Sequence, residues 1–203
     1  MLSLFLKGGP IMWPLLATSL LAVTVVIERL VFMLRERRCR RPDVVETVLD
    51  HVEKGRTDEA IRCGRGNEDF VARTLAYALE HQGRSLSNAI LRAASLELKR
   101  FHRGLPVLDT IITLAPLLGL LGTVTGMIRS FGLMGTEELG APAAITGGIA
   151  EALIATAFGL GIAILALIPF NYLTARMEEA RHEMQDAATH LELLLTGKKE
   201  PRT

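Results

Sequence analysis

Three long apolar segments constrain what this sequence can fold into. They comprise residues 11–34, 110–128 and 141–175 of the 203-residue chain, and most of the charged side chains lie between them. A helix rises 1.5 Å per residue, so about 20 apolar residues span the ~30 Å hydrocarbon core of a bilayer. We therefore predict an all-α membrane protein with three transmembrane helices. The pair Glu28–Arg29 in the first segment is expected near one surface of the bilayer.

The apolar segments divide the chain into six predicted parts. These are the N-terminus with the first transmembrane helix (1–34), a cytoplasmic helical domain (35–104), the second transmembrane helix (105–131), a short outer loop (132–140), the third transmembrane helix (141–175), and a cytoplasmic amphipathic helix with the tail (176–203). The apolar run is long for a signal sequence, so we expect the first segment to be a retained anchor and not a signal peptide.

The basic residues predict the orientation of the three helices. They cluster after the first segment, before the second and after the third: RERRCRR, Lys99, Arg100, Arg103, Arg176, Arg181, Lys198 and Lys199. The predicted outer loop, residues 132–140, carries Glu137 and Glu138 but no Lys or Arg. Because loops rich in Lys and Arg stay in the cytoplasm, the N-terminus is predicted to face outward and the C-terminus inward.

The remaining sequence carries amphipathic helical patterns. Four of them lie in residues 35–104: DVVETVLDHVEKG, TDEAIRCGRG, DFVARTLAYALEHQG and SLSNAILRAASLELKRFHRGL. Ser85 is the expected N-cap of the last one, and Gly104 with Pro106 predicts a kink before the second span. After the third span, small and apolar residues recur along one helix face: Met177, Ala180, Met184, Ala187, Leu191 and Leu194. This face is expected to pack on the chain's own cytoplasmic helices, between subunits as in a coiled coil, or both.

Composition and motifs exclude several classes of function. A formal net charge of +1 gives no indication of nucleic-acid binding. Cys39 and Cys63 lack the spacing of a metal site, so we expect reduced thiols without chemistry. No His, Cys or Ser is paired with a base for nucleophilic catalysis, and no glycine-rich phosphate loop follows a strand. We therefore expect no enzymatic activity, no cofactor and no bound metal.

Small residues share one face of the second span and one face of the third. At about 100° per residue, the face of the second span holds Ala115, Gly119, Gly122, Thr123 and Gly126. The face of the third span holds Ala152, Ala155, Thr156, Gly159 and Ala163. Small residues let helix backbones approach closely, which is a main way in which helices associate in lipid. The two faces are therefore predicted to meet a partner helix or each other.

Three polar side chains accompany these faces. Thr123 and Thr156 either bond a carbonyl of their own helix, as membrane threonines commonly do, or offer hydroxyls to a polar pathway. Glu151 is more unusual, since a charged acid at a helix centre costs at least ~2.5–3.5 kcal/mol on insertion scales. If the third helix begins near Ala141, this acid lies about ten residues, or ~15 Å, inside it. If the helix begins near Ile149, Glu151 marks the outer interface.

Two stretches of the sequence resemble a known family. LAPLLGLLGTVTGMIRSF, together with GGIAEALIATAFGLG and IPFNYL, closely resembles the MotA/TolQ/ExbB proton channel family. The start, FLKGGPIMWPLLATSLLAVTVVIERL, resembles the first span of the ExbB-like branch. Three spans instead of the four of MotA favour the ExbB/TolQ side. The sequence departs from the family at Gly147–Gly148, where ExbB and TolQ often have proline, and at Thr125, where many relatives carry an aromatic residue.

The resemblance implies an energy-converting motor subunit of the bacterial inner membrane. ExbB-like proteins form a ring, usually a homopentamer, whose second and third spans line a central channel. Two single-span ExbD- or TolR-like subunits stand in that channel, and an aspartate on their helix carries the proton. A TonB- or TolA-like transducer passes the work on to outer-membrane transport or envelope maintenance. The implied partners are thus further copies of the chain, these subunits, membrane lipid and protons.

The resemblance also implies roles for single residues. Thr123 in LGTV and Thr156 in IATA match the threonines that line the proton pathway, and Glu151 in IAEA matches the pore glutamate. The small residues of the second and third spans would then pack around the central partner: Ala115, Gly119, Gly122, Gly126, Ala152, Ala155, Gly159 and Ala163. Two other interpretations remain open. One is a non-conducting oligomeric membrane scaffold, and the other is the stator of a flagellar or gliding-type motor.

Overall fold

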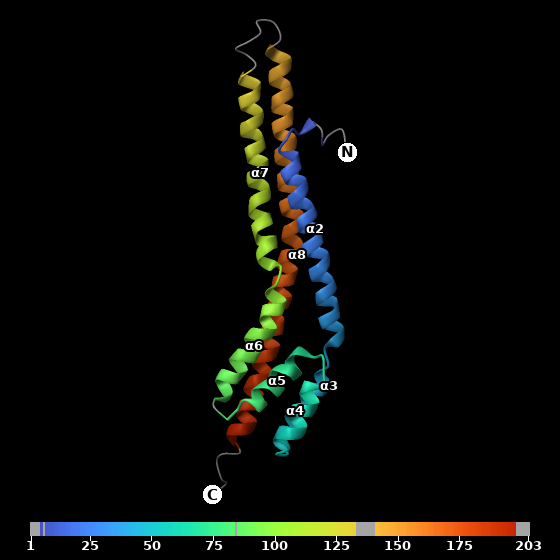
Figure 1. Ribbon diagram of the computed structural model, residues 1–203, viewed down its shortest axis with the longest axis vertical. Coiled ribbons are helices and arrows are strands. Elements are labelled where there is room, and N and C mark those ends of the chain that lie inside the picture. Colours follow the sequence, from blue (N-terminus) through green and yellow to red (C-terminus); the bar gives the residue numbers. More distant parts are fainter. Residues whose placement is uncertain (1–4, 6, 84, 133–140, 198–203) are drawn as a thin grey trace. The chain divides into compact units, whose positions relative to one another are not determined.

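The structure is a computed structural model that describes residues 5, 7–83, 85–132 and 141–197. The regular elements in this part of the chain are helices, as the sequence predicts. They are α2 (Met12–Cys39), α3 (Pro42–Glu53), α4 (Thr57–Arg65), α5 (Phe70–Glu80), α6 (Leu86–His102), α7 (Leu105–Gly132) and α8 (Ala141–Gly197) (Figure 1). Residues 133–140 of the predicted outer loop lie outside the described residues.

Three of these helices are long and apolar enough to cross a membrane. The most apolar stretches of α2 and α7 each have a mean hydropathy of 2.0, and that of α8 has 2.4. This result confirms the predicted all-α chain with three helices of transmembrane length. Helix α8 is a single element of 57 residues, so the third predicted span and the amphipathic segment after it form one continuous helix.

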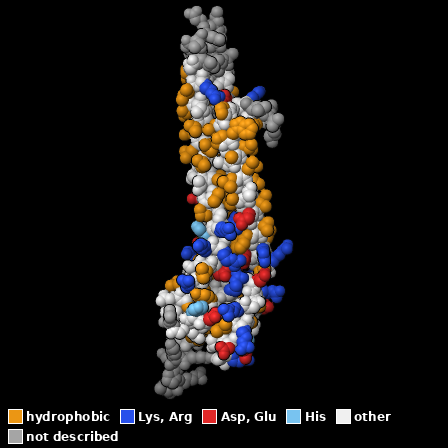
Figure 2. Space-filling view, viewed as in Figure 1, with side chains coloured by type: hydrophobic (Ala, Val, Ile, Leu, Met, Phe, Trp, Pro, Cys, Tyr) orange, Lys and Arg blue, Asp and Glu red, His pale blue; other side chains and the backbone are white. Residues whose placement is uncertain are grey.

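The chain divides into two compact units, and both α2 and α8 contribute to each of them. Unit 1 comprises residues 1–29 and 104–172, and unit 2 comprises residues 30–103 and 173–203. Hydrophobic side chains cover much of the visible surface of unit 1, whereas Lys, Arg, Asp and Glu gather on the helices of unit 2 (Figure 2). Helix α6 ends at His102 and α7 begins at Leu105, with Gly104 at φ +83° between them. The helical conformation is therefore interrupted at the position of the predicted kink.

Unit 1 buries many small side chains at its helix contacts and leaves many large apolar side chains exposed. Ala22 of α2, Ile111 of α7 and Ala166 of α8 form a buried cluster where the three helices pack together. In contrast, large apolar side chains are 61–73 % exposed at Leu20, Ile128 and Leu165. A soluble domain would bury such side chains, whereas a membrane helix presents them to lipid or to another subunit and keeps small residues at its helix contacts.

Unit 2 has an apolar core of the kind that soluble proteins have. Leu75 and Leu79 of α5 are almost fully buried, as are Met184 and Leu191 of α8. The Thr74 hydroxyl of α5 lies 3.4 Å from the Met184 sulfur, so α8 packs directly on α5. The predicted apolar face of the C-terminal segment therefore packs on the chain's own helices. Its contact with another subunit stays a prediction.

Side-chain caps fix the starts of two helices in unit 2. The Ser85 hydroxyl accepts a hydrogen bond from the backbone N–H three residues later at 3.3 Å, which confirms the predicted N-cap. Asp69 is fully buried and caps α5, since its Oδ1 accepts from the N–H groups of Val71 and Ala72 at 2.8 and 3.1 Å. The other oxygen of Asp69 accepts from Arg40 Nη1 at 2.5 Å. A buried carboxylate is tolerated here because each oxygen has a donor.

Candidate functional site: the seam between α7 and α8

The small faces of α7 and α8 pack against each other and form the α7–α8 seam. Its described members are Ala115, Gly119, Gly122 and Gly126 on α7, and Ala152, Ala155, Thr156 and Gly159 on α8. All of them except Thr156 are buried. Of the two alternatives that the sequence left open, the structure thus shows the two faces in contact with each other. Their predicted packing around a central partner helix stays a prediction.

The two backbones touch in the middle of the seam. A Cβ atom at Gly159 would lie 2.5 Å from the Ala115 carbonyl oxygen and 3.1 Å from the Gly119 Cα. A Cβ atom at Gly119 would lie 3.0 Å from the Thr156 Cα. Real Cβ atoms almost never come as close to a backbone atom as 2.5 Å, so position 159 requires glycine at this helix spacing, and a Cβ at position 119 would be unusually crowded. Such close approach brings the carbonyl groups of one helix within reach of the other.

Thr156 uses this proximity to bond across the seam. Its hydroxyl lies 3.0 Å from the Gly119 carbonyl oxygen on α7 and 3.2 Å from the Ala152 carbonyl oxygen one turn back on α8. A hydroxyl has one proton and two lone pairs, so the proton is shared between two acceptors or alternates between them. Thr156 is therefore a polar group that both helices hold in place inside an otherwise apolar contact.

Thr123 is placed differently from Thr156. Its hydroxyl donates to the Leu120 carbonyl oxygen of its own helix at 2.6 Å, which is the local bond expected of a membrane threonine. The side chain lines an open apolar hollow of about 560 Å³ on α7, together with Val124, Met127, Ile128 and Phe131. Thr123 is thus on the part of α7 that another subunit or lipid can contact, at the edge of the face that the sequence predicts.

Glu151 lies at the end of the seam where the N-terminal segment begins α2. Its Oε1 pairs with Arg129 Nη1 of α7 at 3.1 Å, and its side chain is 24 % exposed. Gly9, three residues before α2, packs against the same carboxyl group. Helix α8 begins at Ala141, ten residues before Glu151. The contact with Gly9 nevertheless places the acid beside the start of α2, the first span. The apolar stretch after Glu151 can cross a bilayer unaided, since its 24 residues rise ~36 Å.

Sequence reasoning missed the two partners of Glu151. Arg129 is visible in the sequence only as the charge that ends the second apolar segment, and Gly9 is one of two adjacent glycines near the N-terminus. The spacing of residues in the sequence does not show which side chain Arg129 or Gly9 contacts. Packing determines how far one helix is shifted along another. The pattern Gly8–Gly9 directly before an apolar segment is the one available signal of a tight backbone contact.

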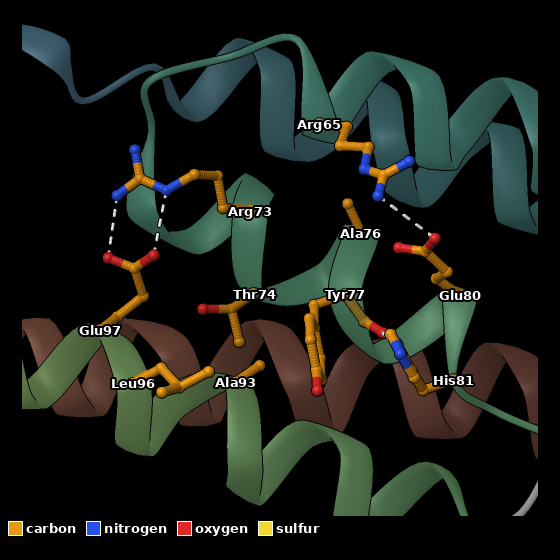
Figure 3. A pocket seen from close by; sticks show the side chains of 10 residues that line it. All are labelled: Arg65, Arg73, Thr74, Ala76, Tyr77, Glu80, His81, Ala93, Leu96 and Glu97. Atoms are coloured by element: carbon orange, nitrogen blue, oxygen red, sulfur yellow. Dashed lines mark hydrogen bonds and ion pairs between the residues drawn. The ribbon is translucent and has the colours of Figure 1, made fainter.

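A second hollow, in unit 2, has no assigned role. It has a volume of about 400 Å³ and lies among α4, α5 and α6 (Figure 3). Its lining combines apolar side chains, a stacked Tyr77–His81 pair and two ion pairs, Arg73–Glu97 and Arg65–Glu80. The charged groups of the two ion pairs are satisfied by each other. In the described residues, we find no group of three or more His, Cys, Asp and Glu side chains arranged to hold a metal ion.

Comparison with known proteins identifies the family of this chain. Residues 65–186 match the MotA/TolQ/ExbB proton channel family. The chain is 38 % identical over 200 residues to the ExbB-like 1 protein of Synechocystis sp., which covers 94 % of this chain and 77 % of that protein. It is 32 % identical over 181 residues to an ExbB homolog of Methanothermobacter thermautotrophicus, which covers 88 % of this chain and 64 % of that protein. It is 29 % identical over 214 residues to the biopolymer transport protein ExbB of Neisseria gonorrhoeae, with 97 % of each chain covered. The chain belongs to the MotA/TolQ/ExbB proton channel family.

Proposed function

We propose that this chain is the proton-channel subunit of an ExbB/TolQ-type motor in a bacterial inner membrane. Five copies form a ring, with the N-terminus outside and the C-terminus in the cytoplasm. Two copies of a single-span ExbD- or TolR-like protein stand inside the ring. Together they convert the proton-motive force into mechanical work, which a TonB- or TolA-like transducer passes on to outer-membrane transport or envelope maintenance. The chain itself performs no enzymatic reaction.

The observation that carries the proposal is the polar contact inside the α7–α8 seam. Thr156 bonds the Gly119 carbonyl oxygen at 3.0 Å in a contact otherwise made by glycine and alanine. Because its proton goes to these carbonyls, the hydroxyl oxygen is left to accept a hydrogen bond from a water or a protonated acid beside it. It carries no charge, so it would not trap the proton as a carboxylate would. Membership of a proton channel family supports this use of the threonine.

The outer surface of unit 1 supports the proposed assembly. Large apolar side chains remain exposed on α7, among them Leu117, Leu120 and Ile128 at 57–66 %. Next to them, the open hollow at Thr123 offers a surface to a helix from another chain. Such a surface suits contact with lipid, with neighbouring copies and with the central partner.

A specific observation favours the scaffold as the second candidate. Both predicted pathway threonines have their hydroxyls bonded to backbone carbonyls, Thr123 to Leu120 and Thr156 to Gly119 and Ala152. Such bonds stabilise helices and helix pairs without any transport. The two functions differ in one property, because a scaffold conducts no protons with any partner.

The test is a proton-flux assay on the assembled complex. The chain would be co-expressed with a single-span ExbD- or TolR-like protein, and the mass of the purified complex would give the copy number of each. Liposomes containing the complex, the ring alone or no protein would then receive a pH gradient. We expect flux from the complex above that of both controls. A complex of correct composition that conducts no more than empty liposomes supports the scaffold instead.

A further inference from the structure

We propose that Arg129 and Gly9 are positioning residues that fix the Glu151 carboxylate at the end of the α7–α8 seam. The expected effects on proton flux rest on the proposed proton-conducting function, whereas the contacts of Glu151 with Arg129 and Gly9 do not depend on it. In this arrangement Glu151 is a stationary acid that ties the N-terminal segment to α7 and α8. It differs from a side chain that swings to carry protons, because two separate contacts oppose its movement.

The first contact is the ion pair across the seam. Arg129 Nη1 of α7 lies 3.1 Å from Glu151 Oε1 of α8. The pair is partly solvated, with the two side chains 55 % and 24 % exposed, and exposed pairs by themselves hold their partners weakly. The ion pair therefore orients the carboxylate but does not immobilise it by itself.

The second contact is made by the backbone of Gly9 against the same carboxylate oxygen that pairs with Arg129. Gly9 has φ +72°, and a Cβ atom there would overlap Glu151 Oε1 and lie 2.6 Å from its Cδ. The adjacent Gly8 is also closely packed, because a Cβ atom there would lie 2.6 Å from the Met12 side chain and 3.1 Å from Ile154 Cγ2. The turn at Gly8–Gly9 thus lies directly on α8 at Glu151 and one turn after it. Any side chain at position 9 would therefore displace the oxygen that pairs with Arg129.

The helix backbones around the pair are themselves fixed. One turn before Glu151, a Cβ atom at Gly148 would overlap the Ser130 hydroxyl and lie 2.9 Å from the Gly126 carbonyl oxygen. Ser130 is buried and donates to that same carbonyl at 3.0 Å. Helices α7 and α8 therefore touch at the turn that carries Arg129 and Glu151.

The proposal predicts coupling between residues 129 and 151. We would purify the complex with its single-span partner and measure proton flux in liposomes and the melting temperature of each variant. Arg129→Gln and Glu151→Gln are each expected to lower flux by roughly tenfold to a hundredfold, as small misplacements of functional groups do. The double variant should be no worse than either single one. Arg129→Lys keeps a positive charge beside Glu151 and should regain part of the flux, which a purely structural effect of lost packing would not predict.

Position 9 provides an independent test with a matched control. Gly9→Ala should lower both flux and melting temperature, whereas Gly147→Ala should change neither, because a Cβ at Gly147 has no neighbour within 4 Å. Shortening the acid should relieve the overlap, so Gly9→Ala/Glu151→Asp is expected to conduct better than Gly9→Ala alone. This rescue distinguishes a collision with the carboxylate from general strain at a positive φ.

Additive effects of the 129 and 151 variants on flux and melting temperature would overturn the proposal. So would a Gly9→Ala variant with the flux of the parent. If the parent complex conducts no protons, the proposed function fails instead, and the melting temperatures alone decide the positioning. In that case non-additive losses support the positioning of Glu151, and additive losses refute it.

Discussion

The Thr156 hydroxyl of α8 bonds the Gly119 carbonyl oxygen of α7 at 3.0 Å, across a contact in which the two backbones touch. This bond joins the two features that the sequence shows separately, a face of small residues and an isolated hydroxyl. The glycines let the helices approach, and the approach brings the carbonyl to the threonine. The following predictions test the seam, the bond within it and the buried charges of unit 2.

Glycine at position 159 is expected to be necessary for the seam. The Cβ atom of Gly159→Ala would lie 2.5 Å from the Ala115 carbonyl oxygen, so the helices must separate. Overpacking of this kind costs about 1–3 kcal/mol of folding free energy. Gly161→Ala, two residues further along α8, meets no atom within 4 Å and should change stability by less than about 0.5 kcal/mol. Thermal unfolding in detergent measures both, and equal losses would contradict the close contact.

Thr156→Val should weaken the contact of α7 with α8. It removes a hydrogen bond between helices, for which about 0.6 kcal/mol on average and up to about 1.7 kcal/mol has been measured in membrane proteins. Thr125→Val is the matched control, because the Thr125 hydroxyl bonds only carbonyls of its own helix at 3.0 and 3.2 Å. Equilibrium unfolding of both variants should show the larger loss at Thr156. A larger loss at Thr125 would argue that the bond across the seam contributes nothing.

Asp69 is expected to be the most sensitive charged residue of unit 2. Asp69→Ala removes the cap of α5 and leaves Arg40 with one fewer acceptor, and breaking a buried ion pair costs about 3–5 kcal/mol. Asp69→Asn keeps an oxygen for the cap and should lose less. Ser85→Ala removes an exposed cap of α6 and should cost only about 1 kcal/mol. Denaturant unfolding ranks the three variants, and a loss at Asp69→Ala no greater than that at Ser85→Ala would refute this role.

Acid should destabilise unit 2 through Glu97. Burial acts to raise the pKa of this carboxyl, but hydrogen bonds from Arg73 and Arg100 outweigh it and hold the pKa below its usual value. A carboxyl with a lowered pKa in the folded state binds fewer protons there than in the unfolded chain. Its stabilising contribution is therefore complete above the unfolded pKa and is lost as the pH falls through the folded one.

The measurement is the melting temperature of the purified protein between pH 7 and acid pH. The parent should lose stability as the pH falls below about 4.5, the usual pKa of a glutamate. Glu97→Gln should be less stable than the parent at pH 7 and should lose less on acidification. Identical pH profiles for the two proteins would show that Glu97 contributes nothing to the acid sensitivity.

Much of the fold follows from patterns that are local in the sequence. Each of the three apolar segments reaches about the length that a bilayer requires, so they predict the three long helices without any tertiary information. The spacing of Gly119 and Gly159 places each on a small face, and Ser85 precedes an amphipathic helix as N-caps do. These features depend on helix geometry alone, which is constant along the chain.

The contacts that the sequence did not reveal are those between distant segments. Arg129 and Glu151 are 22 residues apart, and Arg40 reaches Glu183 across 143 residues. Spacing within one helix cannot show how far two helices are shifted along each other. The structure also separates Thr123 from Thr156, because one bonds its own helix and the other bonds across the seam. Periodicity alone placed both threonines at small faces.

Proton flux through the intact complex, compared between the parent, Thr156→Ser and Thr156→Val, tests the central claim most directly. The three complexes would be reconstituted at equal protein content and checked for equal composition by their mass. We predict flux from the parent, substantial flux from Thr156→Ser, which keeps the hydroxyl, and flux near that of empty liposomes from Thr156→Val. A Thr156→Val complex that conducts protons at the rate of the parent would contradict the account.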